Sequence, residues 1–414
     1  MTYFDLNLSL TDEDRDLKAA AYTFAKEVMR PISIELDRMS PEEVIAPESP
    51  YWDFIRRAYT LGYHKLPFPD VFGGPGLSPF QISLVMEELA WGSFGMTLAL
   101  NTTLDAAVAM GSTPEHIQEF TIPYCACTDG SVVGSWAITE PDHGTDTLMA
   151  GYPSFRDPTI KAQCRARLDG DEYVINGQKA AWVSGGTVAK SVLLMCQIDS
   201  AQGHAGSGMF IFSLDRPGVS KGKPLDKLGT RELNQGEIFF DDVRVPKEYL
   251  VVGPDGYEGA LAAHLSLTTP MVGLWAVGLA RAALDETLAY ARQREQGGKL
   301  LIDHPNVQQA VFDMFRRVEA ARQLCRAAFV YNWSSPPEKR LPEYGFAAKT
   351  FGTQTSLDVT SQAIQIFGGN GISKEYIIEK LFRDARTTMI CDGSNESLSI
   401  AGGHAVARSY PRNG

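Results

Sequence analysis

The first apolar positions of the chain recur at the spacing of one helix face. They are Leu17, Ala21, Phe24 and Val28. Thr11 precedes this run and is followed by three acidic residues, which is the pattern of an N-cap at the positive end of a helix dipole. We therefore expect a helix that begins after Thr11 and ends at Pro31, and further helices over residues 51–61 and 78–91.

The middle of the chain changes to the two-residue period of half-buried strands. Apolar residues alternate with polar ones at Ala162, Cys164, Ala166 and Leu168. Asp169 and Gly170 then form a turn signal, and the apolar runs 191–197 and 209–214 have the length of strands. The pattern predicts an antiparallel β region with many turns over residues 130–247.

Long helical stretches return after this region. Residues 255–293 form one apolar run, and helical spacing marks three more stretches, at 307–321, 342–368 and 375–409. Helices, then a β block, then helices predict an α+β protein with segregated parts rather than alternating βαβ units. The expected domains are an N-terminal helical domain, a central antiparallel β domain and a C-terminal helical domain, over residues 1–129, 130–247 and 248–414.

Composition sets limits but names no function. The chain has 414 residues, of which 44% are hydrophobic, so two or three domains with sizeable cores are expected. Its net charge of -12 argues against nucleic acid and anionic membrane surfaces as partners. The start of the sequence shows no secretory pattern, and no run of about 20 apolar residues predicts a membrane span. Six scattered cysteines indicate a reduced, cytoplasmic protein.

General motif searches find no site. The sequence contains no P-loop, no Rossmann glycine fingerprint, no nucleophile elbow and no metalloprotease motif. The seven histidines are not clustered along the sequence, so no metal site is predicted. His143, His264 and His404 are expected to have surface or capping roles.

Two segments are unusual for purely structural loops. Residues 136–146 place hydroxyls, acids and a glycine directly after an apolar strand, and residues 366–371 place three glycines between helical stretches. Glycines allow a backbone to approach a ligand closely and offer free N–H groups. Each segment by itself is a weak signal.

Together with other segments, these loops resemble the signatures of the acyl-CoA dehydrogenase family, in order and over almost the whole chain. The matching segments are 137–146 (T-E-P-x-x-G-[ST]-D), 176–179 (N-G-x-K), 239–246 (F-x-D-V-x-V-P), 365–371 and 379–386. The length of these motifs and their consistent spacing make the resemblance specific.

The resemblance implies an N-terminal helical domain, a central β domain and a C-terminal four-helix bundle. It also implies FAD shared across the subunit interfaces of a homotetramer, and electron transfer to an electron-transferring flavoprotein. Thr139 corresponds to a flavin contact, and Arg294 and Gln296 to contacts with a neighbour's pyrophosphate. Gln365 and Gly369 correspond to contacts with the adenosine half. The full set of cofactor positions is Ile138, Thr139, Thr145, Trp182, Val183, Ser184, Arg294, Gln296, Gln365, Gly368, Gly369, Ser394 and Glu396.

The reaction implied by the resemblance needs a carboxylate. A thioester acidifies its α C–H bond only weakly, so hydrogen bonds to the carbonyl oxygen and a nearby base must assist proton loss, while the β hydride passes to flavin N5. The family's usual base is a glutamate, and Asp392 occupies its position. Asp105 is a second candidate, because cyclic diene-forming relatives use an aspartate from that region. The family's other base position holds Thr268.

Several positions depart from the family pattern. Asp392 is one methylene shorter than glutamate, which predicts a repositioned base for a branched or cyclic acyl group or for a different carbon. A residual acid without a catalytic role is the alternative. Ser266 and Thr269 stand where an aspartate and an arginine usually bind pantetheine, so both CoA and an acyl-carrier protein stay open as the carrier. Val183 holds the place of a threonine that bonds flavin N5, and Ala181 holds that of the usual tryptophan, with Trp182 one position further on. The substrate-binding positions are Thr145, Thr268, Thr269 and Gly393.

Two other functions stay open. Relatives of this fold use oxygen as oxidases or monooxygenases, and one such branch also has aspartate at the base position. That branch has an arginine seven residues further on, where this chain has Ser399. A non-enzymatic binding subunit is the third alternative, which the changes at Thr269 and Ala181 permit.

Overall fold

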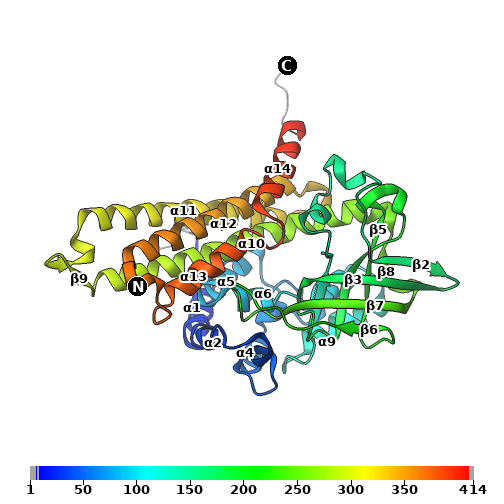
Figure 1. The fold of residues 1–414 in the computed structure, drawn as a ribbon, viewed down its shortest axis with the longest axis horizontal. Coiled ribbons are helices and arrows are strands. Elements are labelled where there is room, and N and C mark those ends of the chain that lie inside the picture. Colours follow the sequence, from blue (N-terminus) through cyan, green and yellow to red (C-terminus); the bar gives the residue numbers. More distant parts are fainter. Residues whose placement is uncertain (1–5, 7–8, 410–414) are drawn as a thin grey trace.

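A computed structural model describes residue 6 and residues 9–409. Helices come first, then a β region, then long helices (Figure 1). The N-terminal helices are α1 (Asp12–Phe24), α2 (Arg30–Leu36), α3 (Pro41–Ile45), α4 (Pro50–Thr60), α5 (Pro79–Gly92), α6 (Phe94–Ala99), α7 (Leu104–Ala109), α8 (Pro114–His116) and α9 (Ile122–Ala126). The predicted start of α1 is confirmed, because Thr11 and Asp14 form a reciprocal capping box.

The expectation that Pro31 ends the first helix is wrong. Residues 25–29 form a π-helical turn, and α2 continues directly from it with Pro31 in its first turn. Proline lacks an N–H group, and inside a regular helix its ring clashes with the carbonyl four residues earlier. The wider π turn changes the register of the carbonyls at this point, so the chain stays helical through the proline.

The β region forms one eight-stranded sheet in the order β6-β7-β3-β1-β4-β5-β8, with β2 beside β3 and β4. Most neighbouring strands are antiparallel, as predicted, but β1 and β2 each pair with β4 in parallel. Gly170 has a left-handed φ of 66° in the predicted hairpin between β2 and β3. The strands are β1 (Gly134–Ala137), β2 (Arg165–Asp169), β3 (Glu172–Ser184), β4 (Ser191–Gln197), β5 (Ser207–Ser213), β6 (Val219–Lys221), β7 (Gln235–Pro246) and β8 (Leu250–Val252).

The two faces of β1 belong to different cores because side chains alternate along a strand. Ala137 packs into a core made within the β region. Trp136 and Ile138 face a second core, which also contains Leu261 and Leu265 from the first long helix of the C-terminal region. The second core therefore joins the sheet to the helices.

The C-terminal region of the described chain has five α-helices. The last of them projects from the others, which lie alongside one another (Figure 1). The most apolar, α10, has the length and composition of a membrane span, but 72% of its most apolar window is buried inside the protein. It is therefore the central core helix. The elements are α10 (Pro254–Ala291), β9 (Glu295–Gln296), β10 (Lys299–Leu300), α11 (Pro305–Ser334), α12 (Pro342–Phe367), α13 (Ile378–Thr388) and α14 (Asn395–Ser409).

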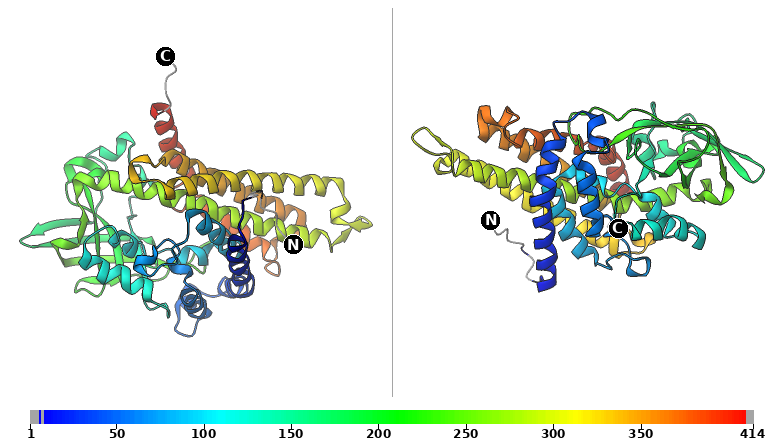
Figure 2. Two further views of the ribbon diagram at one scale, coloured as in Figure 1. Left: turned by 180° about the vertical axis from the view of Figure 1, so that it is seen from behind. Right: turned by 90° about the horizontal axis from the view of Figure 1, so that it is seen from below.

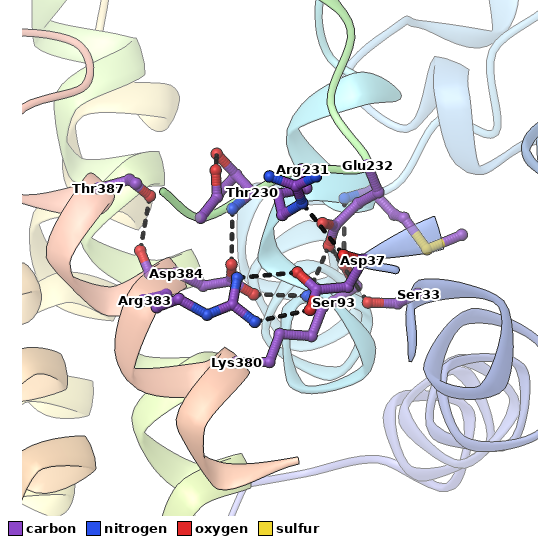
Figure 3. Close-up of polar contacts among 12 residues, drawn as sticks. Ser33, Asp37, Ser93, Thr230, Arg231, Glu232, Lys380, Arg383, Asp384 and Thr387 are labelled. Atoms are coloured by element: carbon purple, nitrogen blue, oxygen red, sulfur yellow. Dashed lines mark hydrogen bonds and ion pairs between the residues drawn. The ribbon is translucent and has the colours of Figure 1, made fainter. Parts of the chain in front are cut away.

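A buried polar network joins all three regions (Figure 3). Lys380 on α13 lies 3.0 Å from Glu232, in the loop before β7, and 2.6 Å from Asp384. Glu232 also accepts a hydrogen bond from Ser33 on α2. Arg383 pairs with Asp37 at the end of α2 at 2.6 Å. These charged groups are buried or nearly buried, so each needs a charged or hydrogen-bonding partner in place of water. Their partners therefore fix how the three regions pack.

Candidate active site

The loop between α13 and α14 carries Asp392 in an unusual backbone conformation. Asp392 has a φ of 50° and Gly393 a φ of 101°. A non-glycine residue in the left-handed region costs about 1–3 kcal/mol, and such strain persists only where the surroundings hold it. The loop therefore presents this carboxylate in one orientation.

Lys349, which is buried on α12, anchors this loop through hydrogen bonds. Its ammonium donates hydrogen bonds to the carbonyl oxygen of Gly393 at 2.6 Å and to Oδ1 of Asn395 at 2.9 Å. Burial raises the pKa of Asp392 to about 6, and the nearby Lys349 cation opposes this rise. A carboxyl group with this pKa is mostly ionised at neutral pH and is a stronger base than an exposed aspartate.

Residues 137–146, the T-E-P loop, contact the Asp392 loop directly. The backbone N–H of Ser394 donates to the hydroxyl oxygen of Thr145 at 3.0 Å. Two segments that are 249 residues apart therefore bring Thr145, Gly393 and Ser394 to one place beside Asp392. The predicted position Glu396 follows in the first turn of α14 and is exposed.

A buried ion pair fixes the first residues of the T-E-P loop. Lys179 on β3 pairs with Glu140 at 2.7 Å and also donates to the carbonyl oxygen of Ile138 at 3.1 Å. The carbonyl oxygen of Thr139 accepts from the N–H of Ala180 at 2.9 Å. The backbone of Ile138 and Thr139 is thereby held against β3, while the side chain of Thr139 stays half-buried.

The side chains of Trp182 and Val183, two of the predicted flavin contacts, lie on opposite faces of β3. The pairing of β3 with β7 shifts register between Lys179 and Val183. Trp182 is 59% exposed, whereas Val183 packs inside the β core. The hydroxyl of Ser184 accepts a hydrogen bond from Gln235. Of these three positions, Trp182 offers the largest side-chain surface to a ligand.

Asp105 lies apart from the Asp392 loop contacts just described. It is buried on α7 against the starts of β1 and β4, where a β-carbon on Gly134 would stand 2.1 Å from its Oδ1. Burial raises the pKa of Asp105 to about 6, and a hydrogen bond with Ser191 opposes the rise. Its Oδ1 has no hydrogen-bond partner. Asp105 is therefore packed between α7 and the sheet.

The two threonines on α10 use their hydroxyls within their own helix. Thr268 donates to the carbonyl oxygen of His264, and Thr269 donates to that of Leu265. Thr269 is fully buried, and a β-carbon on Gly345 of α12 would stand 2.5 Å from its hydroxyl oxygen. Thr269 therefore packs between two helices.

The expected surface role of His264 is wrong. Its Nε2 is buried without a partner, and its ring lies 5.5 Å from that of Trp136, whose Nε1 is also buried and unpaired. Burial lowers the pKa of His264 to about 4, so the ring is neutral. Sequence reasoning missed both this pair and Lys349. The isolated lysine in the apolar stretch around 346–351 was the available signal for Lys349.

The remaining predicted cofactor residues gather elsewhere. Arg294, Gln296, Gln365, Gly368 and Gly369 line a cavity of about 570 Å³ at the junction of α10, α11 and α12. This end of the bundle, near β9, is opposite to the β region (Figure 1), and the view from behind in Figure 2 shows the same separation.

The cavity fits the phosphate and adenosine half of a dinucleotide. β-Carbons on Gly368 and Gly369 would meet nothing within 4 Å, so a ligand can approach the backbone there. Arg294 supplies a cation for a pyrophosphate. The predicted FAD positions of one chain thus form two separated groups, one in this cavity and one around the T-E-P loop, β3 and the Asp392 loop.

Comparison with known proteins identifies the class. The N-terminal, middle and C-terminal domain models of acyl-CoA dehydrogenases match residues 11–126, 135–243 and 255–405. The chain is 32% identical over 406 residues to the probable acyl-CoA dehydrogenase YngJ of Bacillus subtilis (strain 168), which covers 94% of this chain and 97% of that protein.

Solved structures of other proteins are also similar to this chain over almost its whole length. Butyryl-CoA dehydrogenase from Megasphaera elsdenii is similar with a TM-score of 0.84 and 29% identity, over 98% of this chain and 100% of that one. A chain from a study of the electron transferring flavoprotein of Acidaminococcus fermentans is similar with a TM-score of 0.83 and 30% identity, over 98% and 100%.

The chain belongs to the acyl-CoA dehydrogenase family. The predicted family, the α+β architecture and the class of enzyme are confirmed. The protein is an FAD-dependent oxidoreductase that performs acyl-CoA dehydrogenase-type chemistry.

Proposed function

We propose that this enzyme dehydrogenates a branched or cyclic acyl thioester, with Asp392 as the base that takes the α proton. The observation that carries the proposal is the Asp392 loop itself. Its carboxylate has a pKa raised to about 6 by burial and a strained backbone, and Lys349 anchors the loop. Strain and a shifted pKa together are typical of functional sites.

The shorter aspartate side chain supports the proposed substrate class. An aspartate withdraws the carboxylate by one methylene from where glutamate would hold it, and this leaves room beside the acyl chain for a branch or ring. Bound FAD supplies the acceptor for the hydride that leaves the β carbon. Thr145 and the Gly393–Ser394 backbone border the same place and would position the substrate.

We propose that FAD is held between two chains of a homotetramer. Ile138, Thr139, Trp182 and Ser184 would bind the flavin end, with Val183 contributing backbone, and Ser394 and Glu396 lie nearby. A neighbouring chain would supply the cavity that contains Arg294 and Gln365, because one chain carries the two groups in separate places. Light scattering on the yellow holoenzyme checks this, and a monomer that retains FAD contradicts it.

The thiol carrier and the electron acceptor are also proposals. Ser266 and Thr269 offer no charge for a pantetheine arm, which supports an acyl-carrier protein as a second candidate beside CoA. Reduced FAD would pass its electrons to an electron-transferring flavoprotein. The six free cysteines support a cytoplasmic location.

The decisive experiment mixes the purified holoenzyme without oxygen with straight, branched and cyclic acyl-CoAs and with one carrier-linked acyl group. Flavin absorbance is followed. We expect rapid bleaching with one branched or cyclic substrate and little with straight chains. Preference for a straight chain contradicts the substrate class, and no bleaching with any thioester despite bound FAD contradicts the proposed reaction.

Replacing Lys349 by methionine is expected to move the pH dependence of flavin reduction. Lys349 stabilises the ionised form of Asp392, so its removal raises the pKa of Asp392. The pH at which the rate is half-maximal should therefore rise above its value of about 6. Lys339→Met, at an exposed position, is the control. A lower rate with an unchanged pH profile would mean that Lys349 only supports the fold.

A further inference from the structure

Three side chains of metal-ligating types form a cluster outside the residues used so far. Nδ1 of His143 is 2.7 Å and Nε2 of His204 is 3.0 Å from the same oxygen, Oδ2 of Asp146. All three ligand atoms lie within 4.8 Å of one another. His143 and Asp146 belong to the T-E-P loop, and His204 comes from a 3₁₀ segment between β4 and β5.

The surrounding backbone holds the three side chains in place. A pair of hydrogen bonds between Glu140 and His143 closes the T-E-P loop. The N–H of Gly144 donates to Oδ1 of Asp146 at 2.7 Å, which leaves Oδ2 for the two histidines. His204 is buried, with its ring 5.8 Å from that of Phe155. The cluster is therefore formed before any ligand arrives.

The distances suit a metal ion. Two atoms about 2.1 Å from one ion are about 3.0 Å apart when they subtend a right angle, as neighbouring ligands do in octahedral sites. Two histidines and one carboxylate are a common set for divalent transition metals, and three protein ligands leave positions for water or another ligand.

The donor atoms also suit a cation, because one carboxylate oxygen and two imidazole nitrogens can face the same ion. A neutral imidazole can move its proton to the outer ring nitrogen and present the inner one to a metal.

We propose that His143, Asp146 and His204 bind one divalent transition-metal ion of the zinc class. The ion would tie the T-E-P loop to the segment 200–206, next to Thr145 and its contact with the Asp392 loop. In the absence of metal, the same groups form a hydrogen-bonded triad. The proposal does not depend on the substrate or on the base.

The test titrates Co²⁺ into chelator-treated holoenzyme that retains FAD. Bound Co²⁺ is measured as metal content per chain after equilibrium dialysis, and Zn²⁺ is then added as a competitor. We expect one Co²⁺ per chain, displacement by Zn²⁺, and a higher thermal midpoint in the presence of Zn²⁺. Failure to bind one equivalent of either ion overturns the proposal.

Variants of the three side chains test whether the metal ion binds at this cluster. Asp146→Asn and His204→Gln should each weaken metal binding by at least about 10-fold. Asp142→Asn is the matched control, because it removes the same charge from the same loop and should leave binding unchanged. If either cluster variant does not fold, His143→Gln at the half-buried loop position replaces it. Binding that persists equally in the cluster variants overturns the assignment.

Discussion

Asn in place of Asp392 is expected to slow anaerobic flavin reduction by about 10²–10⁴-fold while FAD stays bound. The amide keeps the size and most contacts of the side chain but cannot accept the α proton. FAD retention is expected because the cavity lined by Arg294 and Gln365 lies at the other end of the bundle. Stopped-flow absorbance with the preferred thioester measures the rate.

Asp105→Asn is the matched control for this experiment. It makes the same chemical change at another buried acid, but one that packs against the start of the sheet. We expect its rate to stay within a few-fold of the natural enzyme. The opposite ranking, with Asp105→Asn slow and Asp392→Asn near normal, would reassign the base to Asp105.

The pH dependence of the natural enzyme follows from the same group. Only the ionised form of Asp392 can take a proton, and its pKa is about 6. The reduction rate should therefore be constant above about pH 7 and fall about tenfold per pH unit well below pH 6. This acid limb should be absent from the residual rate of Asp392→Asn.

Replacing Lys380 by methionine is expected to destabilise the protein by about 3–5 kcal/mol. The Lys380 ammonium is the shared partner of Glu232 and Asp384, and all three side chains are at most 4% exposed. Methionine keeps the length of the chain but leaves two buried carboxylates without this cation (Figure 3). Denaturant unfolding, followed with FAD content, measures the loss.

The expected loss depends on pH in a definite direction. Without Lys380, burial and mutual repulsion raise the folded-state pKa of Glu232 and Asp384 above the unfolded values. Such groups favour folding at low pH and lose that contribution as pH rises. The variant should therefore approach the natural protein at pH 5 and differ most at pH 8. Lys374→Met, at an exposed position in the segment before α13, should change stability by less than about 0.5 kcal/mol.

The sequence by itself determined the local structure and the class of the protein. Thr11 and Ser78 mark helix starts because their hydroxyls cap free N–H groups. Gly170 marks a hairpin because the turn needs a left-handed residue. The motifs around Thr139 and Gln365 identified the family because they are long and lie at consistent spacing.

Only the tertiary structure decided which distant side chains meet. Thr145 touches Ser394 across 249 residues, and His204 joins Asp146 across 58. The packing of β3 in the sheet decided that Trp182 faces outward and Val183 inward. Local spacing fixes backbone conformation within a few residues, whereas these contacts depend on how whole elements pack. That packing is set by burial of many side chains together, which no short pattern in the sequence records.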